Sequence, residues 1–306
     1  MSIKILKTET LTWVNIDQVD EQAVAYLKES YTFHPLDLED VRGESHTPKI
    51  DTYKNYLFMI LQFPQWRGET HSVVAHELDI FIGENYIITI QNTKSRDLKN
   101  FFYRCMKNRN IKRDWMSSTS GYLLYKLLEA LFKSTQPILN SIGKELSQLE
   151  QNIFDGDEDE QNVKELALHR RNVLNFRRII DPQRYLVASL SHIRKPFLSE
   201  ETSLYFDDIN DYLSKLWTIV DTYKDTINGL HVTTESLLSQ KTNKVIRTLT
   251  VISVGLLPFT LLASVYGMNI SNLPYAQHPL WVWGMFLILA LVVTASIVVM
   301  KIKKWL

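Results

Sequence analysis

The chain ends in two apolar segments, LTVISVGLLPFTLLASVYGMN at residues 249–269 and LWVWGMFLILALVVTASIVVM at residues 280–300. The first has about 17 residues before its YGMN ending and the second about 21, so the first is at the short end for a ~30 Å bilayer core and the second is ample. No Asp or Glu occurs from Lys241 to Leu306, and basic residues flank the segments at 241–247 and 301–304. Because basic flanks stay on the cytoplasmic side, the pattern predicts a two-span hairpin in the plasma (inner) membrane with both termini in the cytoplasm.

The rest of the chain has a different composition. The 306 residues balance 34 basic against 34 acidic side chains, but every acidic side chain lies before residue 241. Residues 1–240 are numerous enough to form a soluble domain with its own core. The N-terminus has no apolar stretch of the kind that marks a cleavable signal. The single cysteine, Cys105, excludes an internal disulfide and a zinc site built from cysteines.

The two spans differ in their polar content. Polar side chains recur along the first span and its basic approach, among them Asn243, Thr250, Ser253, Thr260 and Ser264. The second span contains only Thr294 and Ser296. Polar side chains in a membrane prefer other helices or water, so we expect the first span to face these and the second to face lipid. Trp281 and Trp283 are expected at the outer membrane interface and Trp305 at the inner one.

Residues 1–95 are predicted to form a mixed α/β cytoplasmic domain. Runs rich in β-branched and aromatic residues predict strands at 10–14, 56–63, 78–82 and 86–91, and residues 22–31 predict a helix. The sequence DLED at 37–40 has the composition of a metal-binding carboxylate cluster. Three acids in the first turn of a helix are more often solvated, and we interpret the segment in that way.

Residues 96–200 are predicted to form the helical part of the cytoplasmic domain. Apolar side chains recur at three- and four-residue steps across 122–153 and again across 163–186, which predicts two long antiparallel helices. The segment between them, FDGDEDE at 154–160, resembles the start of a calcium loop. Such a loop needs glycine at its sixth position and glutamate at its twelfth, and the chain has neither there. We therefore interpret the segment as a solvated turn.

A stricter repeat runs from Tyr205 to Leu237. Its positions alternate four- and three-residue steps: Ile209, Leu213, Leu216, Val220, Tyr223, Ile227, Leu230, Thr234 and Leu237. The repeat leads into the first span, so residues 201–265 are expected to form one stalk helix of about sixty residues, roughly 90 Å long. Such a seam packs either within its own chain or against identical stalks, and its continuity with a membrane span favours a bundle of stalks. An outer loop (266–279), the second span (280–300) and a basic tail (301–306) follow.

These features together resemble a known family. A long stalk leads into two C-terminal spans, the first of which closes with Tyr-Gly-Met-Asn at 266–269, and a Lys-rich tail follows the second. Together with KTNKV at 241–245, LLPFT at 256–260, LDLED at 36–40 and NYLF at 55–58, this pattern resembles the CorA family of divalent-cation (magnesium) transporters. The resemblance implies a funnel-shaped homopentamer with α/β cytoplasmic domains, in which five copies of the first span surround one pore.

The chemistry of Mg²⁺ restricts how such a pore can work. Mg²⁺ is small and gives up its bound waters reluctantly, and the first span has no carboxylate to replace them. Side-chain amides and backbone carbonyls can instead accept hydrogen bonds from the coordinated waters and pass the hydrated ion whole. We expect Asn269 to form this outer ring, with Gly267 permitting a tight turn and Met268 packing behind it.

The resemblance implies further rings along the first span. Thr260 and Asn243 would form polar rings, whereas Leu257, Leu249 and Ile246 would form apolar constrictions that close by dewetting. Each set also has an ordinary interpretation. The polar side chains can bond to neighbouring helices, and the apolar ones can contact lipid or core. Residue types alone leave both interpretations open, and the resemblance favours the pore.

The resemblance also implies regulation by cytoplasmic Mg²⁺. In the family, acidic sites between neighbouring cytoplasmic domains bind Mg²⁺ and hold the closed state. Asp208 matches one half of such a site. Where relatives carry an acidic pair after the third strand, this chain reads FPQWRGE at 63–69, so only Glu69 is nearby and Arg67 would oppose a cation. Asp208 is therefore either half of a regulatory metal site or a solvated stalk residue.

The transported ion stays open on sequence grounds. Many magnesium-transporting relatives have an acidic residue shortly after the Asn of the motif, whereas this chain reads NLPYA at 272–276 followed by His278. Softer ions such as Zn²⁺, Co²⁺ or Ni²⁺ are an alternative, and so is a non-conducting membrane-anchored sensor or scaffold. No phosphate-binding glycine loop, nucleophile elbow or His-Glu metal helix indicates an enzyme. We expect no cofactor beyond the divalent cation, no nucleic-acid partner, and contacts with identical chains and membrane lipid.

Overall fold

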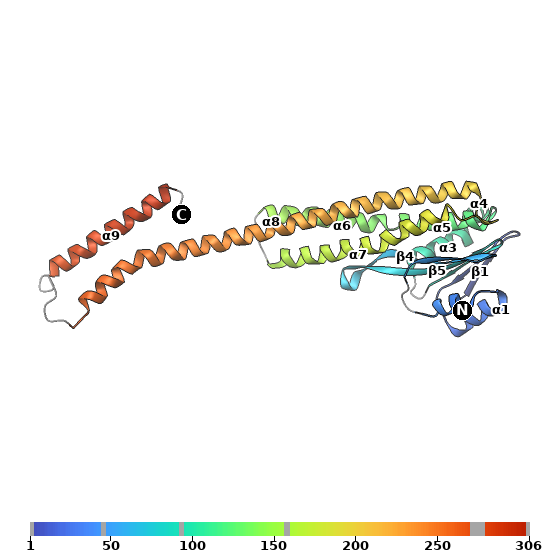
Figure 1. Ribbon diagram of the computed structural model, residues 1–306, viewed down its shortest axis with the longest axis horizontal. Coiled ribbons are helices and arrows are strands. Elements are labelled where there is room, and N and C mark those ends of the chain that lie inside the picture. The colour runs from blue at the N-terminus through green and yellow to red at the C-terminus, as the bar shows by residue number, and fades with distance from the viewer. Residues whose placement is uncertain (1–2, 44–46, 92–94, 156–159, 270–278, 304–306) are drawn as a thin grey trace. The chain divides into compact units, whose positions relative to one another are not determined.

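The computed structural model describes residues 3–43, 47–91, 95–155, 160–269 and 279–303. They form two compact units, Met1–His231 and Val232–Leu306, and helix α8 (Glu200–Tyr266) contributes to both (Figure 1). The centre of the calcium-like turn, the outer loop at 270–278 and Trp305 lie outside the described residues. The expectations for those segments stay predictions.

The first unit is built on a six-stranded sheet. Its strands are β1 (Ile3–Lys7), β2 (Thr12–Ile16), β3 (Lys49–Thr52), β4 (Tyr56–Arg67), β5 (Ser72–Gly83) and β6 (Tyr86–Ile90). The order across the sheet is β1-β2-β6-β5-β4-β3, and neighbours are antiparallel except β2 and β6, which run parallel. The four predicted strands are confirmed as β2, β4, β5 and β6, and β4 and β5 are longer than expected.

Two strands, β1 and β3, were not predicted from the pattern of β-branched and aromatic residues. β1 reads IKILK and β3 reads KIDT, so charged side chains interrupt the apolar residues of both. They are the two edge strands of the sheet. Charged residues are common on edge strands because they discourage pairing with other chains. A pattern search for buried strands therefore passes over them.

Helices make up most of the rest of the described chain. They are α1 (Glu21–Ser30), α2 (Pro35–Asp40), α3 (Arg96–Lys107), α4 (Arg109–Met116), α5 (Ser120–Lys133), α6 (Gln136–Phe154), α7 (Glu160–Leu190), α8 and α9 (Pro279–Ile302). The helix predicted at 22–31 is confirmed as α1, with a shift of one residue. In the second unit, α9 extends the predicted span of 280–300 by one residue at its start and two at its end.

The prediction of one long helix across 122–153 is wrong, because the chain breaks between α5 and α6. The Ser134 hydroxyl donates to the Leu131 carbonyl at 2.8 Å, and the Thr135 hydroxyl donates to the Phe132 carbonyl at 2.7 Å. These bonds occupy carbonyls that end α5. Pro137 then lies in the first turn of α6, where its missing N–H does no harm. The apolar period continues through the break and hides it.

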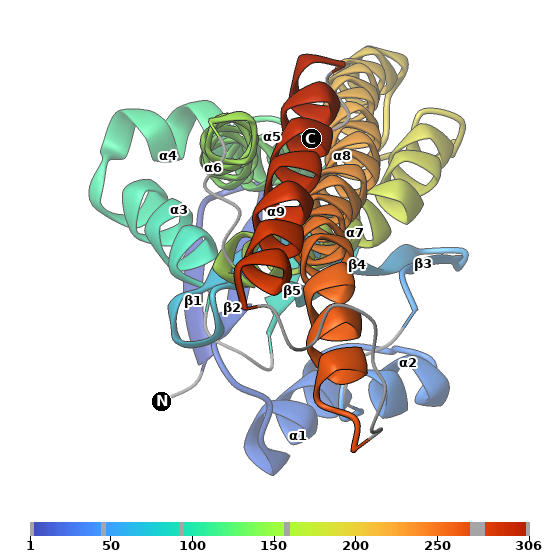
Figure 2. The ribbon, with the colours of Figure 1, turned by 90° about the vertical axis from the view of Figure 1, so that its left-hand side faces the viewer.

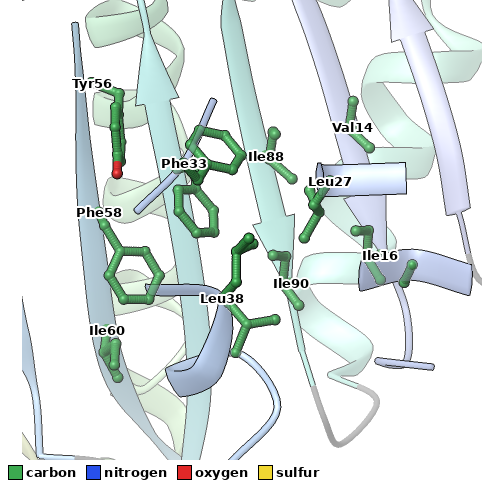
Figure 3. Packing of buried hydrophobic residues seen from close by; sticks show 13 residues of the cluster. Val14, Ile16, Leu27, Phe33, Leu38, Tyr56, Phe58, Ile60, Ile88 and Ile90 are labelled. Atoms are coloured by element: carbon green, nitrogen blue, oxygen red, sulfur yellow. The ribbon is translucent and has the colours of Figure 1, made fainter. Parts of the chain in front are cut away.

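An aromatic and aliphatic core fills the face of the sheet beneath α1 and α2. Alternate strand residues point to this face: Val14, Ile16, Tyr56, Phe58, Ile60, Phe81, Ile88 and Ile90. α1 contributes Leu27 and α2 contributes Leu38. Phe33, between the two helices, stacks on Phe81 with ring centroids 4.0 Å apart. Figure 3 shows these side chains gathered between strands and helices, as the two-residue period of a strand requires.

The opposite face of the sheet is covered by helices from the second half of the unit, including α5 and α7 (Figure 2). Trp13 of β2 points to this side and packs edge-on against Phe102 of α3, with ring centroids 4.7 Å apart. Its indole N–H donates to the Thr89 hydroxyl at 3.1 Å, and Thr89 donates to Asn15 Oδ1 at 2.9 Å. The buried polar side-chain atoms of Trp13 and Thr89 are thus paired, as burial requires.

Helix α7 fixes the tip of the β4–β5 hairpin through two asparagines. The Asn172 side chain accepts from the Val73 N–H at 3.1 Å and donates to the His71 carbonyl at 3.0 Å. Asn175 donates to the Val73 carbonyl at 3.1 Å. His71 follows the short turn η1 (Gly68–Thr70) and has a left-handed backbone with φ 44°, which is uncommon for a residue other than glycine. The bonds to α7 hold that conformation in place.

The stalk repeat packs within its own chain over its first part. Its buried residues in α8 are Phe206, Ile209, Leu213, Leu216, Val220, Ile227 and Leu230. The guanidinium groups of Arg177 and Arg184 of α7 lie 5.5 and 4.8 Å from the ring centre of Trp217 in α8. The prediction of a seam between identical stalks is wrong for this part, because α7 already covers it. Beyond Leu230, Thr234 and Leu237 are only half-buried.

Gly121→Ala should lower the stability of the first unit by about 1–3 kcal/mol, the usual cost of overpacking. A Cβ at Gly121 in α5 would lie 2.2 Å from the backbone carbonyl oxygen of Phe197, which cannot swing away as a side chain can. The measurement is thermal unfolding of the purified protein in detergent, followed by tryptophan fluorescence.

Gly229→Ala in α8 is the matched control for this substitution. Nothing lies within 4 Å of a Cβ placed there, and alanine favours a helix interior, so it should raise stability by about 0.5–1 kcal/mol. Equal melting temperatures for the two variants would contradict the close packing of α5.

Candidate functional site

In the second unit, α9 folds back alongside the last part of α8 (Figure 1). Among the described residues, these two helices are long and apolar enough to cross a membrane, and their most apolar windows are not buried within the chain. Phe259 stacks on Phe286 with ring centroids 6.4 Å apart, and the Tyr266 hydroxyl lies 3.8 Å from the Met285 sulfur. These contacts turn one face of α8 toward α9.

The predicted pore residues lie on the other face of α8. The half-buried residues of this part of the helix are Val251, Gly255, Pro258, Phe259, Leu262 and Tyr266, which form the side that meets α9. Asn243, Ile246, Leu249, Leu257 and Thr260 are all exposed. At roughly 100° per residue, these five fall within an arc of roughly 120° centred opposite α9. We call this set the α8 stripe, and the structure brings all five predicted residues onto it.

Thr260 forms the ordinary helix hydrogen bond and still presents an acceptor. Its hydroxyl donates to the Leu256 carbonyl at 3.1 Å. The donor is thus used inside the helix, while the lone pairs of the hydroxyl oxygen stay available. Waters bound to a cation act as donors, so this orientation suits a hydrated ion. This bond stays within α8 and reaches no neighbouring helix, so it leaves both interpretations of Thr260 open.

Two serines outside the predicted site lie on the same face. Ser253 and Ser264 are exposed, and within the described residues neither hydroxyl has a hydrogen-bond partner. Thr250 and Ser296, by contrast, each donate to the carbonyl four residues earlier. An unpaired hydroxyl in an apolar environment costs about 1–3 kcal/mol, so both serines are candidates for contact with water. Ser253 lies four residues before Leu257 and Ser264 four residues after Thr260, and this spacing is the sequence signal that finds them.

Helix α8 ends at Tyr266, and the Gly-Met-Asn motif forms the turn after it. The Gly267 N–H bonds to the Ala263 carbonyl at 2.9 Å. Gly267 does not have a left-handed backbone, and a Cβ there would lie 3.0 Å from the Ala263 oxygen, a close contact that glycine avoids. Met268 is 52% exposed and Asn269 is exposed as well, so the packing of Met268 behind Asn269 stays a prediction.

Asp208 lies on an exposed side of α8 in the first unit, close to α5. Burial, Glu129 and then Asp208 raise the pKa of Tyr125 to about 12. The pKa of Lys133 is raised mainly by the hydrogen bond that Lys133 donates to Glu129 at 2.7 Å, and the charge of Asp208 adds to this effect. Asp208 therefore has a cation of its own chain nearby. Glu69 lies elsewhere, in η1 at the hairpin tip.

The DLED segment is not the solvated turn that the sequence suggests. Asp37 is 1% exposed and accepts hydrogen bonds from two tyrosine hydroxyls, at 2.8 and 2.7 Å. Lys49 bridges Asp40 and Asp51 at 2.7 and 2.6 Å, and oxygens of the three aspartates lie within 4.8 Å of one another. Because Lys49 already supplies the positive charge among them, we interpret the group as an internal ion-pair network that supports the fold.

Asp79→Asn should make stability less dependent on pH. Asp79 of β5 is 2% exposed, its Oδ1 has no partner within the described chain, and burial raises its pKa well above the usual range. With a raised folded pKa, the stabilising contribution is full below the ordinary Asp pKa of about 3.9 and is lost as pH rises through the folded pKa. Asparagine does not ionise, so the variant has no such loss of stability. Its melting temperature should therefore rise relative to that of the wild type between about pH 5 and pH 8.

Glu84→Gln, in the exposed turn between β5 and β6, is the control for removal of a carboxylate. Its melting temperature should follow that of the wild type at both pH values. If the melting temperatures of Asp79→Asn and the wild type differ by the same amount at every pH, the pKa of Asp79 does not change on folding.

Known proteins share this arrangement. Residues 8–304 match the model of the family described as CorA-like Mg²⁺ transporter protein. The chain is 30% identical to the cobalt/magnesium transport protein CorA of Thermotoga maritima, over 98% of this chain and 84% of that protein. It is 20% identical to the zinc transport protein ZntB of Pectobacterium atrosepticum, over 99% of this chain and 90% of that protein. The complete structure of the CorA magnesium transporter from Methanocaldococcus jannaschii matches with a TM-score of 0.81 at 19% identity, over 95% of this chain and 92% of that one. From the extent of the family match and the identity to a curated member, this chain belongs to the CorA-like Mg²⁺ transporter family of divalent-cation transporters.

Proposed function

We propose that the chain forms a homopentamer in the plasma (inner) membrane, with both termini in the cytoplasm, and conducts hydrated Mg²⁺ through a central pore lined by five copies of α8. The observation that carries this proposal is the α8 stripe. Its polar and apolar residues share the face of α8 turned away from α9, and among the described residues of one chain nothing covers this face. Five such faces around one axis would cover one another.

The polar members of the stripe suit a hydrated ion. Mg²⁺ prefers oxygen ligands and keeps several of its waters when it binds. Thr260 and Asn243 offer a hydroxyl and an amide, Asn269 offers an amide beyond the helix end, and no carboxylate lies in this part of the chain. Uncharged oxygens accept hydrogen bonds from the water shell without stripping it. Weak binding at several levels also lets the ion leave, as conduction requires.

The apolar members of the stripe supply a gate. Ile246, Leu249 and Leu257 are 55, 63 and 63% exposed in one chain, so they are free to face an axis. A narrow ring of such side chains disfavours water, and an ion that carries its waters cannot pass a ring that has dewetted. Small changes in the radius of the ring would then open or close the pore.

Transport of Zn²⁺, Co²⁺ or Ni²⁺ is the second candidate function. It is favoured by the similarity to a zinc transport protein over 99% of this chain. The sequence of the outer loop also carries His278 and no carboxylate, and imidazole suits these softer ions. A membrane-anchored sensor would use the same helices without conduction and is the remaining alternative.

Uptake into proteoliposomes tests the proposal. The purified protein is reconstituted, and uptake of Mg²⁺, Zn²⁺, Co²⁺ and Ni²⁺ is compared side by side, with and without a proton gradient. Mg²⁺ uptake at least as fast as that of the other ions supports the proposal, and faster Zn²⁺ uptake moves the function to the second candidate. Intact oligomers that take up none of the four ions would leave only the sensor. The mass of the assembly in detergent counts the chains.

Asp208→Ala should weaken inhibition by Mg²⁺ on the cytoplasmic side, because we propose Asp208 as half of a regulatory cation site. The expected result is faster uptake at millimolar internal Mg²⁺ and unchanged uptake at low Mg²⁺. Asp207→Ala removes an exposed carboxylate one residue away and is the control. An unchanged Mg²⁺ response, or the same shift in both variants, would reduce Asp208 to a solvated stalk residue.

A further inference from the structure

The helices α3 and α4 carry a concentration of positive charge that ion transport does not explain. Residues 96–116 contain seven Lys or Arg and two Asp, in a chain whose total charge is balanced. Some of these cations have structural roles. Lys112 Nζ donates to the Lys7 carbonyl at 2.8 Å, and Lys99 Nζ lies 6.0 Å from the ring centre of Tyr103. The others need a different explanation.

A cavity of about 1040 Å³ opens among α3, α4 and α5. It is lined by α3 from its first turn to its last, by the first turn of α4, and by Ala130 and Ser134 at the end of α5. Its size is at the upper end of the range for pockets that hold a small molecule, on the order of 300–1,000 Å³. The cavity lies wholly within the first unit, so it exists in each copy of the chain.

Three cations border this cavity: Arg104, Lys107 and Arg109. Within the described residues none of them forms an ion pair or a hydrogen bond through its side chain. The one carboxylate of the lining, Asp97, accepts a hydrogen bond from the Ser134 hydroxyl at 3.1 Å. The three cations outnumber this one carboxylate and none is paired with it, so the lining keeps a net positive charge without a full counter-charge. An anionic ligand with several oxygens would supply one, because Arg and Lys bind phosphate oxygens through charge-assisted hydrogen bonds.

Two aromatic side chains, Phe101 and Tyr103, line the cavity, and we call them its aromatic floor. Phe101 stacks on Trp115 with ring centroids 4.2 Å apart and planes within 8°, and it meets Trp13 edge-on at 5.7 Å. Asn108 fixes the angle between α3 and α4, since its N–H donates to the Arg104 carbonyl at 3.0 Å and its Oδ1 accepts from the first N–H groups of α4. The site is therefore formed before any ligand arrives.

We propose that this cavity binds a nucleoside triphosphate, with the phosphates on Arg104, Lys107 and Arg109 and the nucleoside toward the aromatic floor. Several cations on one rim require a ligand with several negative oxygens, which excludes a free divalent cation. The aromatic floor adds contact that an inorganic polyphosphate cannot use. The Mg²⁺-free form should bind more tightly than the Mg²⁺ complex, because coordinated Mg²⁺ neutralises part of the charge that the three cations recognise.

Calorimetry on the full-length protein in detergent tests this site. The probes are ATP, inorganic triphosphate and adenosine, each with excess chelator and again with excess Mg²⁺. ATP should bind below millimolar concentration, triphosphate more weakly, and adenosine not at all. Arg104→Gln and Arg109→Gln should each weaken ATP binding by about tenfold, the usual effect of losing one charge-assisted hydrogen bond. Thermal unfolding without ligand checks that both variants fold.

Arg113→Gln is the matched control. Arg113 lies in α4, is exposed and does not line the cavity, so its loss should weaken binding by at most about twofold, as for an isolated surface charge. The proposal fails if neither phosphate probe binds, if adenosine binds as well as ATP, or if Arg113→Gln weakens binding as much as Arg104→Gln. Short-chain phosphatidate is tested as a competitor of ATP. If it displaces ATP as effectively as inorganic triphosphate does, the cavity is instead assigned to a lipid headgroup.

Discussion

Asn269→Ala should reduce divalent-cation uptake into proteoliposomes by about a hundredfold, while the oligomer keeps its size in detergent. In the proposed assembly, Asn269 supplies one amide from each chain at the outer end of the pore. Losing a hydrogen bond to a charged group costs about 1.5–3 kcal/mol, and a barrier higher by about 2.7 kcal/mol slows passage a hundredfold. Initial rates of uptake, measured with the ion that the wild type carries fastest, give the comparison.

Two controls separate the amide from its surroundings. Asn269→Gln keeps an amide and should retain part of the uptake. Ser296→Ala removes a polar group from α9 whose hydroxyl already donates to the Val292 carbonyl at 2.9 Å, so uptake should stay at the wild-type rate. If Asn269→Ala carries ions as fast as the wild type, the motif does not select the ion and the pore assignment is wrong.

Leu257→Ser should raise basal uptake by about tenfold or more under conditions that close the wild-type pore. Leu257 lies on the α8 stripe and is 63% exposed in one chain. A ring of hydroxyls in place of isobutyl groups would hold water where the leucines exclude it. A lowering of the barrier by about 1.4 kcal/mol is enough for a tenfold increase. The measurement is uptake at inhibitory internal Mg²⁺, where the wild-type rate is lowest.

Leu262→Ser is the matched control on the opposite face of the same helix. Leu262 is half-buried on the side that meets α9, so the change should weaken helix packing without hydrating an axis. Its basal uptake should stay at the wild-type level. A similar increase in both variants would mean that the leak follows from a loosened hairpin, and Leu257 would not be a gate.

Hydropathy and charge predict the membrane part well because they report the solvent of each segment directly. The absence of carboxylates after Glu235 and the two apolar runs are enough to place α9 and the end of α8. The four strands with buried faces were also predictable, since β-branched and aromatic residues mark them. The edge strands β1 and β3 were not, because their charged residues suit a position that only the assembled sheet defines.

Burial of a polar side chain is harder to predict than burial of an apolar one. Asp37 is buried because the hydroxyls of Tyr53 and Tyr56 reach it, and these partners lie 16 and 19 residues later in the chain. No local pattern relates them. The break between α5 and α6 was missed for a similar reason: Ser134 and Thr135 end one helix while the apolar period runs on into the next.

Periodicity also identifies a buried face without identifying what buries it. The stalk repeat of α8 was expected to meet identical chains, but residues up to Leu230 pack within their own chain. The stripe farther along α8 has the same kind of spacing, and there the contacts with α9 occupy the opposite side. The structure thus separates two apolar faces of one helix that look alike in the sequence, and it adds Ser253 and Ser264 to the second.

Helix α8 is one piece of 67 residues with a single proline inside it, Pro258. A continuous hydrogen-bonded helix resists torsion. A rotation of its buried part would therefore also rotate the side chains of the α8 stripe. Pro258 has no N–H to donate to the carbonyl four residues earlier, so the helix lacks one backbone hydrogen bond there. This gap lies next to Leu257 and just before Thr260. In the proposed pore, α8 would therefore be stiffer before Pro258 than at it, and a rotation of its earlier turns would be taken up next to Leu257.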